Sequence, residues 1–175
     1  SGINGSAFTA YTSGGEVRKA VTSISGLDHL EGETVACLAD GNVVAGLTVS
    51  NGAVTLSRAA SRVHIGLGYT TDLETLDLNY TTRAGTIQGR LKKVAKVVLR
   101  FEETRGGFVG PDADNLVEMK QREFELLGQP TQLITGDREV VITPDWNTGA
   151  RIFIRQTDPL PLTLLAVVPD VAIGG

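Results

Sequence analysis

Residues 145–168, DWNTGARIFIRQTDPLPLTLLAVV, decide the fold of this chain. The stretch predicts two strands joined by a stiff corner, because Pro159 and Pro161 each fix φ and lack a backbone donor. β-Branched, aromatic and leucine side chains fill both arms, as is usual in strands. In the second arm, period two places Leu162, Leu164, Ala166 and Val168 on one face and Leu165 and Val167 on the other. Both faces are apolar, which is typical of a strand covered on both sides.

Residues 26–68 predict a small antiparallel β meander or barrel. Short apolar runs at residues 33–39, 43–50, 53–56 and 62–67 each have the length of a strand. Asp40-Gly41-Asn42 supplies turn chemistry between the first two runs, and Asn51-Gly52 is the strongest two-residue hairpin signal in the chain. The lead-in from Gly26 to Gly32 is expected to form a compact loop.

A second sandwich-like β unit is expected over residues 89–173. Its clearest strand lies within 89–101, where Val97, Leu99 and Phe101 alternate with Lys96, Val98 and Arg100. A further strand is expected at 137–143. Residues 114–127 form either the one plausible helix, with a poor apolar stripe, or a long excursion between strands.

The remaining segments carry weaker patterns. Residues 1–25 are rich in Gly, Ser and Thr and predict loops with one or two edge strands. Residues 69–88 predict a connector, either irregular or with a short helical turn, and a soft boundary between subdomains. The fold class is therefore all-β or mainly β: an antiparallel sandwich or barrel, in one domain or in two packed small units with at most one short helix.

Composition restricts the function classes. The chain has 175 residues, 21 glycines, one cysteine and a net charge of −4. One cysteine excludes an internal disulfide framework, and Cys37 lies in an apolar run where a small core side chain is expected. No apolar run approaches the length of about 20 residues that crosses a bilayer. Because the chain begins Ser1-Gly2 without a Met or a signal-peptide pattern, we expect it to be an excised fragment.

Two polar groups invite an enzymatic or metal interpretation. Asp28, His29 and His64 suggest a hydrolase, but no nucleophile elbow is present and His64 interrupts a strand pattern. The run from Asp112 to Asn115 faintly resembles a calcium loop, yet position six is Val117 where the EF-hand requires Gly. We therefore expect no enzyme, no metal site and no cofactor.

The remaining candidates are interaction residues. Arg90, Lys92, Lys93, Lys96 and Arg100 form a basic cluster that could touch DNA phosphates. Lys92, Lys96 and Arg100 would share one strand face. A solvated strand face protected by lysine against edge pairing explains the cluster equally simply. Trp146, the one tryptophan, stands at a strand entry and is either a core corner or a ligand platform. A receptor- or carbohydrate-binding module is therefore an open alternative.

Four sequence blocks resemble a known structural family. They are GLDHLEGETV at 26–35 with Ala-Asp-Gly at 39–41, SRVHIGL at 61–67, residues 89–100 with Arg105-Gly106, and Thr135-Gly136-Asp137 followed by Trp146 and RQTDPLPL at 155–162. In this order they resemble the C-terminal part of the tail nozzle, or tail tubular and packaged-DNA stabilisation, proteins of short-tailed bacteriophages and prophages. Family members commonly carry a larger aliphatic residue where this chain has Cys37.

The resemblance implies a virion structural protein made in the host cytoplasm and no catalytic residue. Copies of such a protein form a homo-oligomeric ring below the portal and adaptor proteins. The ring forms the DNA conduit, helps to retain the packaged genome, and touches DNA only transiently during ejection. A net acidic chain is compatible with this role, because each neutralised phosphate would add affinity and slow the passage of DNA.

Overall fold

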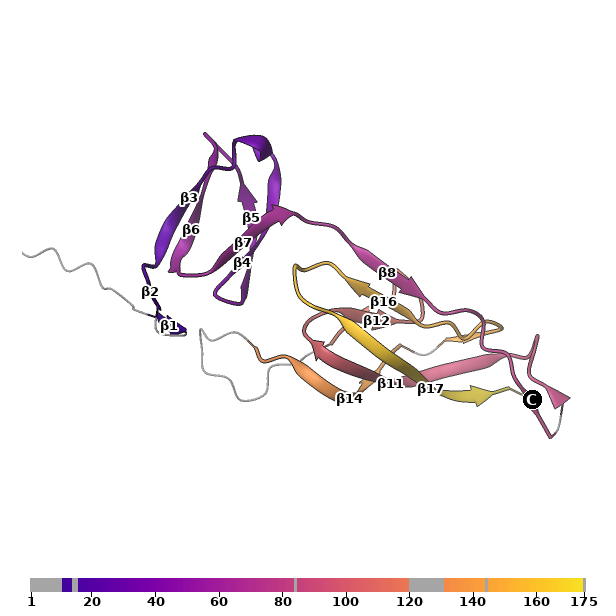
Figure 1. Ribbon diagram of the computed structural model, residues 1–175. Coiled ribbons are helices and arrows are strands. Elements are labelled where there is room, and N and C mark those ends of the chain that lie inside the picture. Colours follow the sequence, from indigo (N-terminus) through magenta and orange to yellow (C-terminus); the bar gives the residue numbers. More distant parts are fainter. Residues whose placement is uncertain (1–10, 14–15, 84, 120–130, 144, 175) are drawn as a thin grey trace, which may run out of the picture. The chain divides into compact units, whose positions relative to one another are not determined.

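The computed structural model describes residues 11–13, 16–83, 85–119, 131–143 and 145–174. Within these ranges the chain forms antiparallel strands and one 3₁₀ turn, η1 (Asp28–Leu30) (Figure 1). The predicted fold class, a mainly β antiparallel sandwich, is confirmed. The chain separates into two compact units, the first ending at Gly68 and the second beginning at Tyr69.

The first unit contains a three-stranded sheet in the order β5-β4-β7, a two-stranded sheet of β3 and β6, and a hairpin of β1 and β2. The strands are β1 (Tyr11–Ser13), β2 (Glu16–Arg18), β3 (Val21–Ser25), β4 (Thr34–Ala39), β5 (Asn42–Thr48), β6 (Ala53–Ala60) and β7 (Val63–Leu67). Val35, Cys37 and Ala39 of β4 are buried with Val54 and Leu56 of β6. Apolar alternation along both strands therefore builds the core of this unit.

The turn at Asn51-Gly52 forms as predicted, but the strands that it joins do not pair as a meander. Both turn residues have positive φ, and Ser50 and Ala53 exchange two backbone hydrogen bonds of 2.9 and 3.2 Å. Beyond that bridge the chain changes sheets: β5 pairs with β4, while β6 pairs with β3. The strand order is therefore not that of a simple meander, one of the two arrangements expected for residues 26–68, because a local turn signal says nothing about which partner each strand takes further on.

Two carboxylates join the turns of the first unit. The carboxylate of Glu31 accepts hydrogen bonds from the backbone N–H groups of Asn51 at 2.9 Å and Gly52 at 2.7 Å. These bonds hold the segment around η1 against the Asn51-Gly52 turn. Asp40, in the turn after β4, accepts the N–H groups of Ser61 at 3.0 Å and Arg62 at 2.7 Å. The φ of +64° at Gly52 favours glycine there, and a Cβ would require the carboxylate of Asp28 to move.

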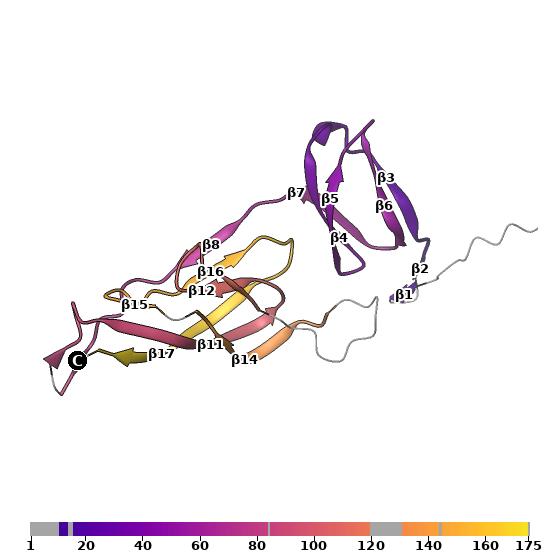
Figure 2. The same cartoon turned by 180° about the vertical axis from the view of Figure 1, so that it is seen from behind.

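The second unit is a sandwich of two sheets. In the first sheet β11 pairs with β17 along one edge and with β14 and β15 along the other; the second sheet has the order β13-β12-β16-β8 (Figure 2). The strands of this unit are β8 (Thr71–Glu74), β9 (Thr81–Thr82), β10 (Gly85–Thr86), β11 (Lys92–Thr104), β12 (Phe108–Gly110), β13 (Val117–Glu118), β14 (Ile134–Val141), β15 (Trp146–Asn147), β16 (Phe153–Gln156) and β17 (Thr163–Ile173).

The core of the second unit lies between these sheets. Val97, Leu99 and Phe101 of β11 pack with Val109 of β12 and Ile154 of β16. The predicted alternation at 96–101 is therefore confirmed, with the apolar members inside. Because β11 supplies buried residues along most of its length and pairs with three strands, it is the central strand of this unit.

Two β-bulges set which side chains enter this core. The register between β11 and β17 runs from Val94↔Val171 to Lys96↔Asp170, which leaves Ala95 without a partner. It also shifts between Arg100↔Ala166 and Phe101↔Leu164, which leaves Leu165 without a partner. After each extra residue, the positions of that strand that point into the core change from even to odd numbers or from odd to even numbers.

The prediction that the second arm of the organising stretch is buried on both faces was wrong. Leu164 and Val167 pack on the core, while Leu165 and Val168 are each 57% exposed. The bulge at Leu165 breaks period two, so Leu164 and Val168 do not share a face. In addition, among the described residues only one face of this sheet meets a second sheet, so Leu165 and Val168 on the outer face are exposed.

One further segment differs from expectation, and in another the described part follows the second of two alternatives, an excursion between strands. Residues 71–74, expected within a connector, form β8 and pair with β16 of the second sheet. Residues 114–119 are not helical, since the carboxylate of Asp112 accepts the N–H groups of Asp114 and Asn115 at 2.9 Å and β13 follows. Such an Asx turn offers the backbone an alternative to the helix. The remainder of the expected helix, 120–127, lies outside the described residues.

Candidate functional site

Two members of the predicted basic cluster are neutralised by acids on the neighbouring strand. Nζ of Lys96 lies 3.1 Å from Glu139 Oε2. The guanidinium of Arg100 binds Asp137 through two hydrogen bonds of 2.7 and 2.9 Å. Both pairs join β11 to β14 on the exposed outer face of the sheet. This part of the cluster is therefore a ladder of surface ion pairs, which contribute little to stability individually and leave little free positive charge for a ligand.

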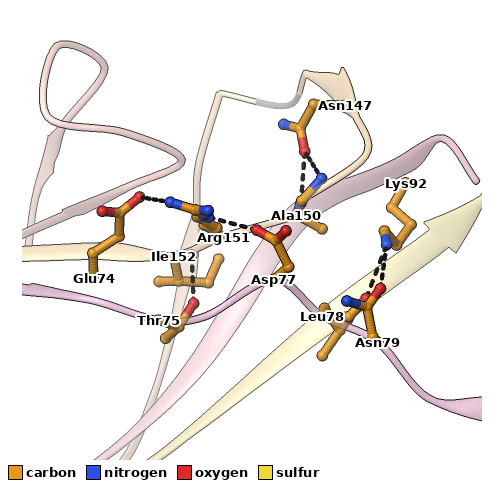
Figure 3. Close-up of polar contacts among 11 residues, drawn as sticks. Glu74, Thr75, Asp77, Leu78, Asn79, Lys92, Asn147, Ala150, Arg151 and Ile152 are labelled. Carbon is orange, nitrogen blue, oxygen red and sulfur yellow. Dashed lines mark hydrogen bonds and ion pairs between the residues drawn. The ribbon is translucent and has the colours of Figure 1, made fainter. Parts of the chain in front are cut away.

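Lys92 does not lie on that face. It is fully buried, and its Nζ donates to the carbonyl oxygen of Leu78 at 2.9 Å and to Oδ1 of Asn79 at 3.2 Å (Figure 3). It also donates to the carbonyl oxygen of Ile87 at 3.5 Å. The prediction that Lys92 shares a face with Lys96 and Arg100 was wrong, because the bulge at Ala95 puts Lys92 on the core side. Its ammonium ties the segment between β8 and β11 to the start of β11.

Trp146 and Arg90 lie at the same end of β11 as Lys92. Trp146 is 47% exposed and stands opposite Lys93, whose Nζ lies 5.9 Å from the centre of the indole ring. Arg90 is exposed just before β11 begins. Trp146 is therefore a partly open platform beside a lysine, and not a buried corner.

The second sheet carries an ion-pair network on its exposed side that was not anticipated from the sequence. Arg151 bridges Glu74 at 3.1 Å and Asp77 at 2.6 Å (Figure 3). Arg155 makes two hydrogen bonds of 2.7 and 2.9 Å to Asp72, its cross-strand partner on β8. Complementary charges at 72–77 and 151–155 could have suggested the pairing, but they become informative only once β8 and β16 are known to be neighbours.

The histidines and the acidic loop occupy surface positions. His29 is exposed on η1 and His64 is exposed on β7, and within the described residues neither makes a hydrogen bond or an ion pair. The pKa of Asp112 lies below its usual value, because its carboxylate accepts hydrogen bonds from the side chain of Asn115 and from the backbone N–H of Asp114. In the described parts of the chain, no group of three or more His, Cys, Asp or Glu side chains is arranged to hold a metal ion.

Cys37 is fully buried in the first unit. Desolvation raises the pKa of its thiol, so the reactive thiolate is disfavoured and the side chain is a packing residue in the folded state. None of the helices among the described residues is long and apolar enough to span a membrane.

The ion pairs on the exposed sides of the two sheets predict a pH dependence. The hydrogen bonds from Arg100 hold the pKa of Asp137 below its ordinary value, and Arg155 does the same for Asp72. A carboxyl whose pKa is lowered in the folded state stabilises that state above the unfolded pKa, and this contribution is lost as the pH falls through the folded pKa. We therefore expect the second unit to lose stability below about pH 4.

This prediction is checked by following the carboxyl titration of Asp137 by NMR in the parent and in Arg100→Gln. The variant should return the pKa of Asp137 toward its ordinary value, while Asp72 should titrate as before because its partner Arg155 is unchanged. An Asp137 titration that is the same in both proteins would contradict the assigned ion pair.

Comparison with known proteins assigns no function to these residues. No protein-family model matches the chain, and no curated protein matches it.

Proposed function

We propose that this chain is a structural part of a virion, a module of the tail nozzle ring of a short-tailed bacteriophage or prophage. In that role copies associate head to tail in a ring next to portal and adaptor proteins and enclose the DNA conduit. The observation that carries the proposal is the ordered set of four sequence blocks, because these blocks coincide with the parts that hold each unit together.

Each of the four sequence blocks contains residues that stabilise or form part of the fold, and a structural family would conserve such residues. Residues 26–35 form the lead-in whose Glu31 closes the turn at Asn51-Gly52. Residues 61–67 contain the backbone groups bound by Asp40 and then β7. Residues 89–100 supply the greater part of β11, and residues 155–162 lead from β16 through the proline corner to β17. A family defined by architecture would keep such positions.

The outer face of β11 supports the same role. A conduit wall should hold DNA weakly, and here Lys96 and Arg100 are already paired with Glu139 and Asp137. Each Lys or Arg that is occupied by a carboxylate is not available to displace counterions from phosphate. The pairing therefore favours weak, transient contact over tight binding.

Electron microscopy and a DNA-binding titration test this function. The full-length protein should form rings, and the dissociation constant of the chain for duplex DNA at physiological salt should lie at about 10⁻⁴ to 10⁻⁶ M, the range of non-specific contact. A full-length protein that stays monomeric at its highest soluble concentration, or a chain that binds duplex DNA with submicromolar affinity, would contradict the proposal.

Partial exposure of Trp146 favours one alternative function, a receptor- or carbohydrate-binding β module of a tail or cell-surface protein. An exposed indole stacks on sugar rings and is a common anchor in binding sites. A glycan array distinguishes the two functions. Reproducible binding that is lost on replacing Trp146 or Tyr69 would support the alternative, and no binding is expected for a nozzle module.

A further inference from the structure

We propose that one end of the second unit is a sequence-independent nucleic-acid contact, formed by Arg83, Arg90, Lys93 and Trp146. We call these four residues the basic end. The inference rests on the proposed function, which brings DNA past the protein, and it moves the expected DNA contact away from Lys96 and Arg100.

The fold brings the segments of the basic end together. Arg83 lies in the turn between β9 and β10, and the N–H of Ile87 returns to the carbonyl oxygen of Tyr80 at 3.1 Å. Lys92 binds the carbonyl oxygens of Leu78 and Ile87 and so fixes this hairpin segment at the start of β11. Figures 1 and 2 both show the hairpin beside the C-terminal end of β17.

Charge is distributed unevenly along this part of the chain. Residues 78–101 contain no Asp or Glu and six Lys or Arg, although the whole chain has a net charge of −4. Lys96 and Arg100 are bound to carboxylates, and Lys92 is buried. The three cations that remain are those of the basic end, and within the described residues none of them makes an ion pair.

The acids nearest in sequence leave these cations available. Asp77, which precedes the acid-free stretch, is bound at 2.6 Å by Arg151. Asp145 is exposed next to Trp146 and is the one carboxylate directly beside the basic end in sequence. The basic end therefore carries three cations against one exposed acid adjacent in sequence, in a chain whose net charge is −4. A local excess of positive charge is the electrostatic footprint of a surface that meets phosphates.

Trp146 adds a second element to this surface. The cross-strand pairing places Lys93 opposite Trp146, and the ring lies against Gly174, whose N–H binds the carbonyl oxygen of Leu91 at 2.8 Å. The indole therefore holds the Lys93 ammonium by a cation–π contact and is itself partly exposed. Against duplex DNA, whose bases are already stacked, the ring serves to position the Lys93 ammonium. Stacking of bases on such a ring is open only to single strands.

The number of cations favours a nucleic acid over a lipid surface. Recognition of anionic lipid by basic side chains takes clusters of about four to eight Lys or Arg. The basic end offers three. Three phosphate contacts are enough for a weak DNA contact whose logarithmic affinity falls with logarithmic salt at a slope of about −2.7, so that binding weakens about forty-fold between 50 and 200 mM salt.

Fluorescence anisotropy of a labelled random-sequence duplex, titrated with the full chain over a range of salt, tests the proposal. Arg83→Gln, Arg90→Gln and Lys93→Gln should each reduce the slope by about 0.9, and the triple variant should remove the salt-dependent binding. Lys96→Gln and Arg100→Gln are matched controls on the same strand, and both should leave the slope near that of the parent. Asp145→Asn should tighten binding, because it removes the adjacent negative charge.

Three results would overturn the inference. The first is a slope that the substitutions at the basic end do not change. The second is an equal loss from the Lys96 and Arg100 controls, which would return the contact to the outer face. The third is binding to phosphatidylglycerol vesicles that the triple variant loses, without any change in DNA binding, which would make this end a lipid contact.

Failure of the inference is separable from failure of the proposed function. The triple variant should assemble as the parent does in electron microscopy, because the basic end is assigned to DNA and not to ring formation. Rings together with unchanged DNA binding in the triple variant would reject the basic end alone. Absence of rings in the full-length protein would reject the nozzle function whatever the anisotropy shows.

Discussion

Replacing Phe101 by alanine should lower the free energy of unfolding of the second unit by about 4 kcal/mol. The ring is 1% exposed and lies on β11 in the middle of the core, against residues of the opposite sheet. Truncation removes the transfer free energy of the ring and leaves a cavity between two sheets that are held by their own hydrogen bonds. Collapse around that cavity is therefore limited, and the cost lies at the upper part of the usual range.

Chemical denaturation with a reporter in each unit measures this effect. Trp146 fluorescence follows the second unit, and the reactivity of the buried Cys37 thiol follows the first. Phe101→Ala should shift the tryptophan transition and leave the protection of Cys37 unchanged. Val98→Ala is the matched control, because Val98 belongs to the same strand on its outer face, and it should cost below about 1 kcal/mol. Equal costs for the two variants would contradict the facing assigned to β11.

Replacing Lys92 by alanine should destabilise the second unit by about 3 kcal/mol. The substitution removes about three buried methylene groups, at about 0.8 kcal/mol each. It also leaves the carbonyl oxygens of Leu78 and Ile87 without the charged donor that they bind at 2.9 and 3.5 Å. Part of this cost is offset, since a buried ammonium no longer has to be desolvated.

Lys92→Met separates these terms, because methionine keeps most of the apolar volume and supplies no donor. We expect its cost to be about half of that of alanine, and hydrogen exchange to speed up selectively at residues 78–91 in both variants. A uniform increase across the second unit would show that Lys92 acts by packing alone. A methionine variant as stable as the parent would show that the hydrogen bonds contribute nothing.

Patterns that depend on one strand alone were predictable from the sequence. The alternation at 96–101 placed Val97, Leu99 and Phe101 inside, and the Asn51-Gly52 dipeptide identified its turn. Such signals are local, because they follow from side-chain period and from φ preferences. The mainly β class rests on them and was predicted correctly.

Features that depend on a partner strand were not predictable. The bulge at Ala95 is a property of the β11–β17 ladder, so the sequence assigned Lys92 to the outer face. β8 has little apolar alternation of its own, and it is a strand because Asp72 and its neighbours pair with β16. The same reason explains why the ion pairs at Asp137 and Glu139 were missed, since they lie 37 and 43 residues from Arg100 and Lys96.

Dependence on a partner strand also explains why some candidate residues are available for contacts and others are not. Arg90 and Trp146 remain at an exposed end, while Lys96 and Arg100 are occupied by acids that only the register of β14 brings near. Lys93 was part of the predicted basic cluster, and only Arg83 was overlooked, although the absence of acids between residues 78 and 101 was visible in the sequence. Counting charges of both signs over that window would have indicated Arg83.

The two bulges of the β11–β17 ladder cancel each other. Paired residue numbers add to 265 at Val94↔Val171, to 266 from Lys96↔Asp170 to Arg100↔Ala166, and to 265 again at Phe101↔Leu164. Each strand thus contributes one surplus residue, at opposite ends of a five-pair segment. A homologue that lacked both surplus residues could keep every inward and outward assignment in an unbroken ladder. A homologue that lacked only one surplus residue would have its strand register shifted by one residue from that point to the end of the sheet. Insertions and deletions in these two strands should therefore occur in pairs.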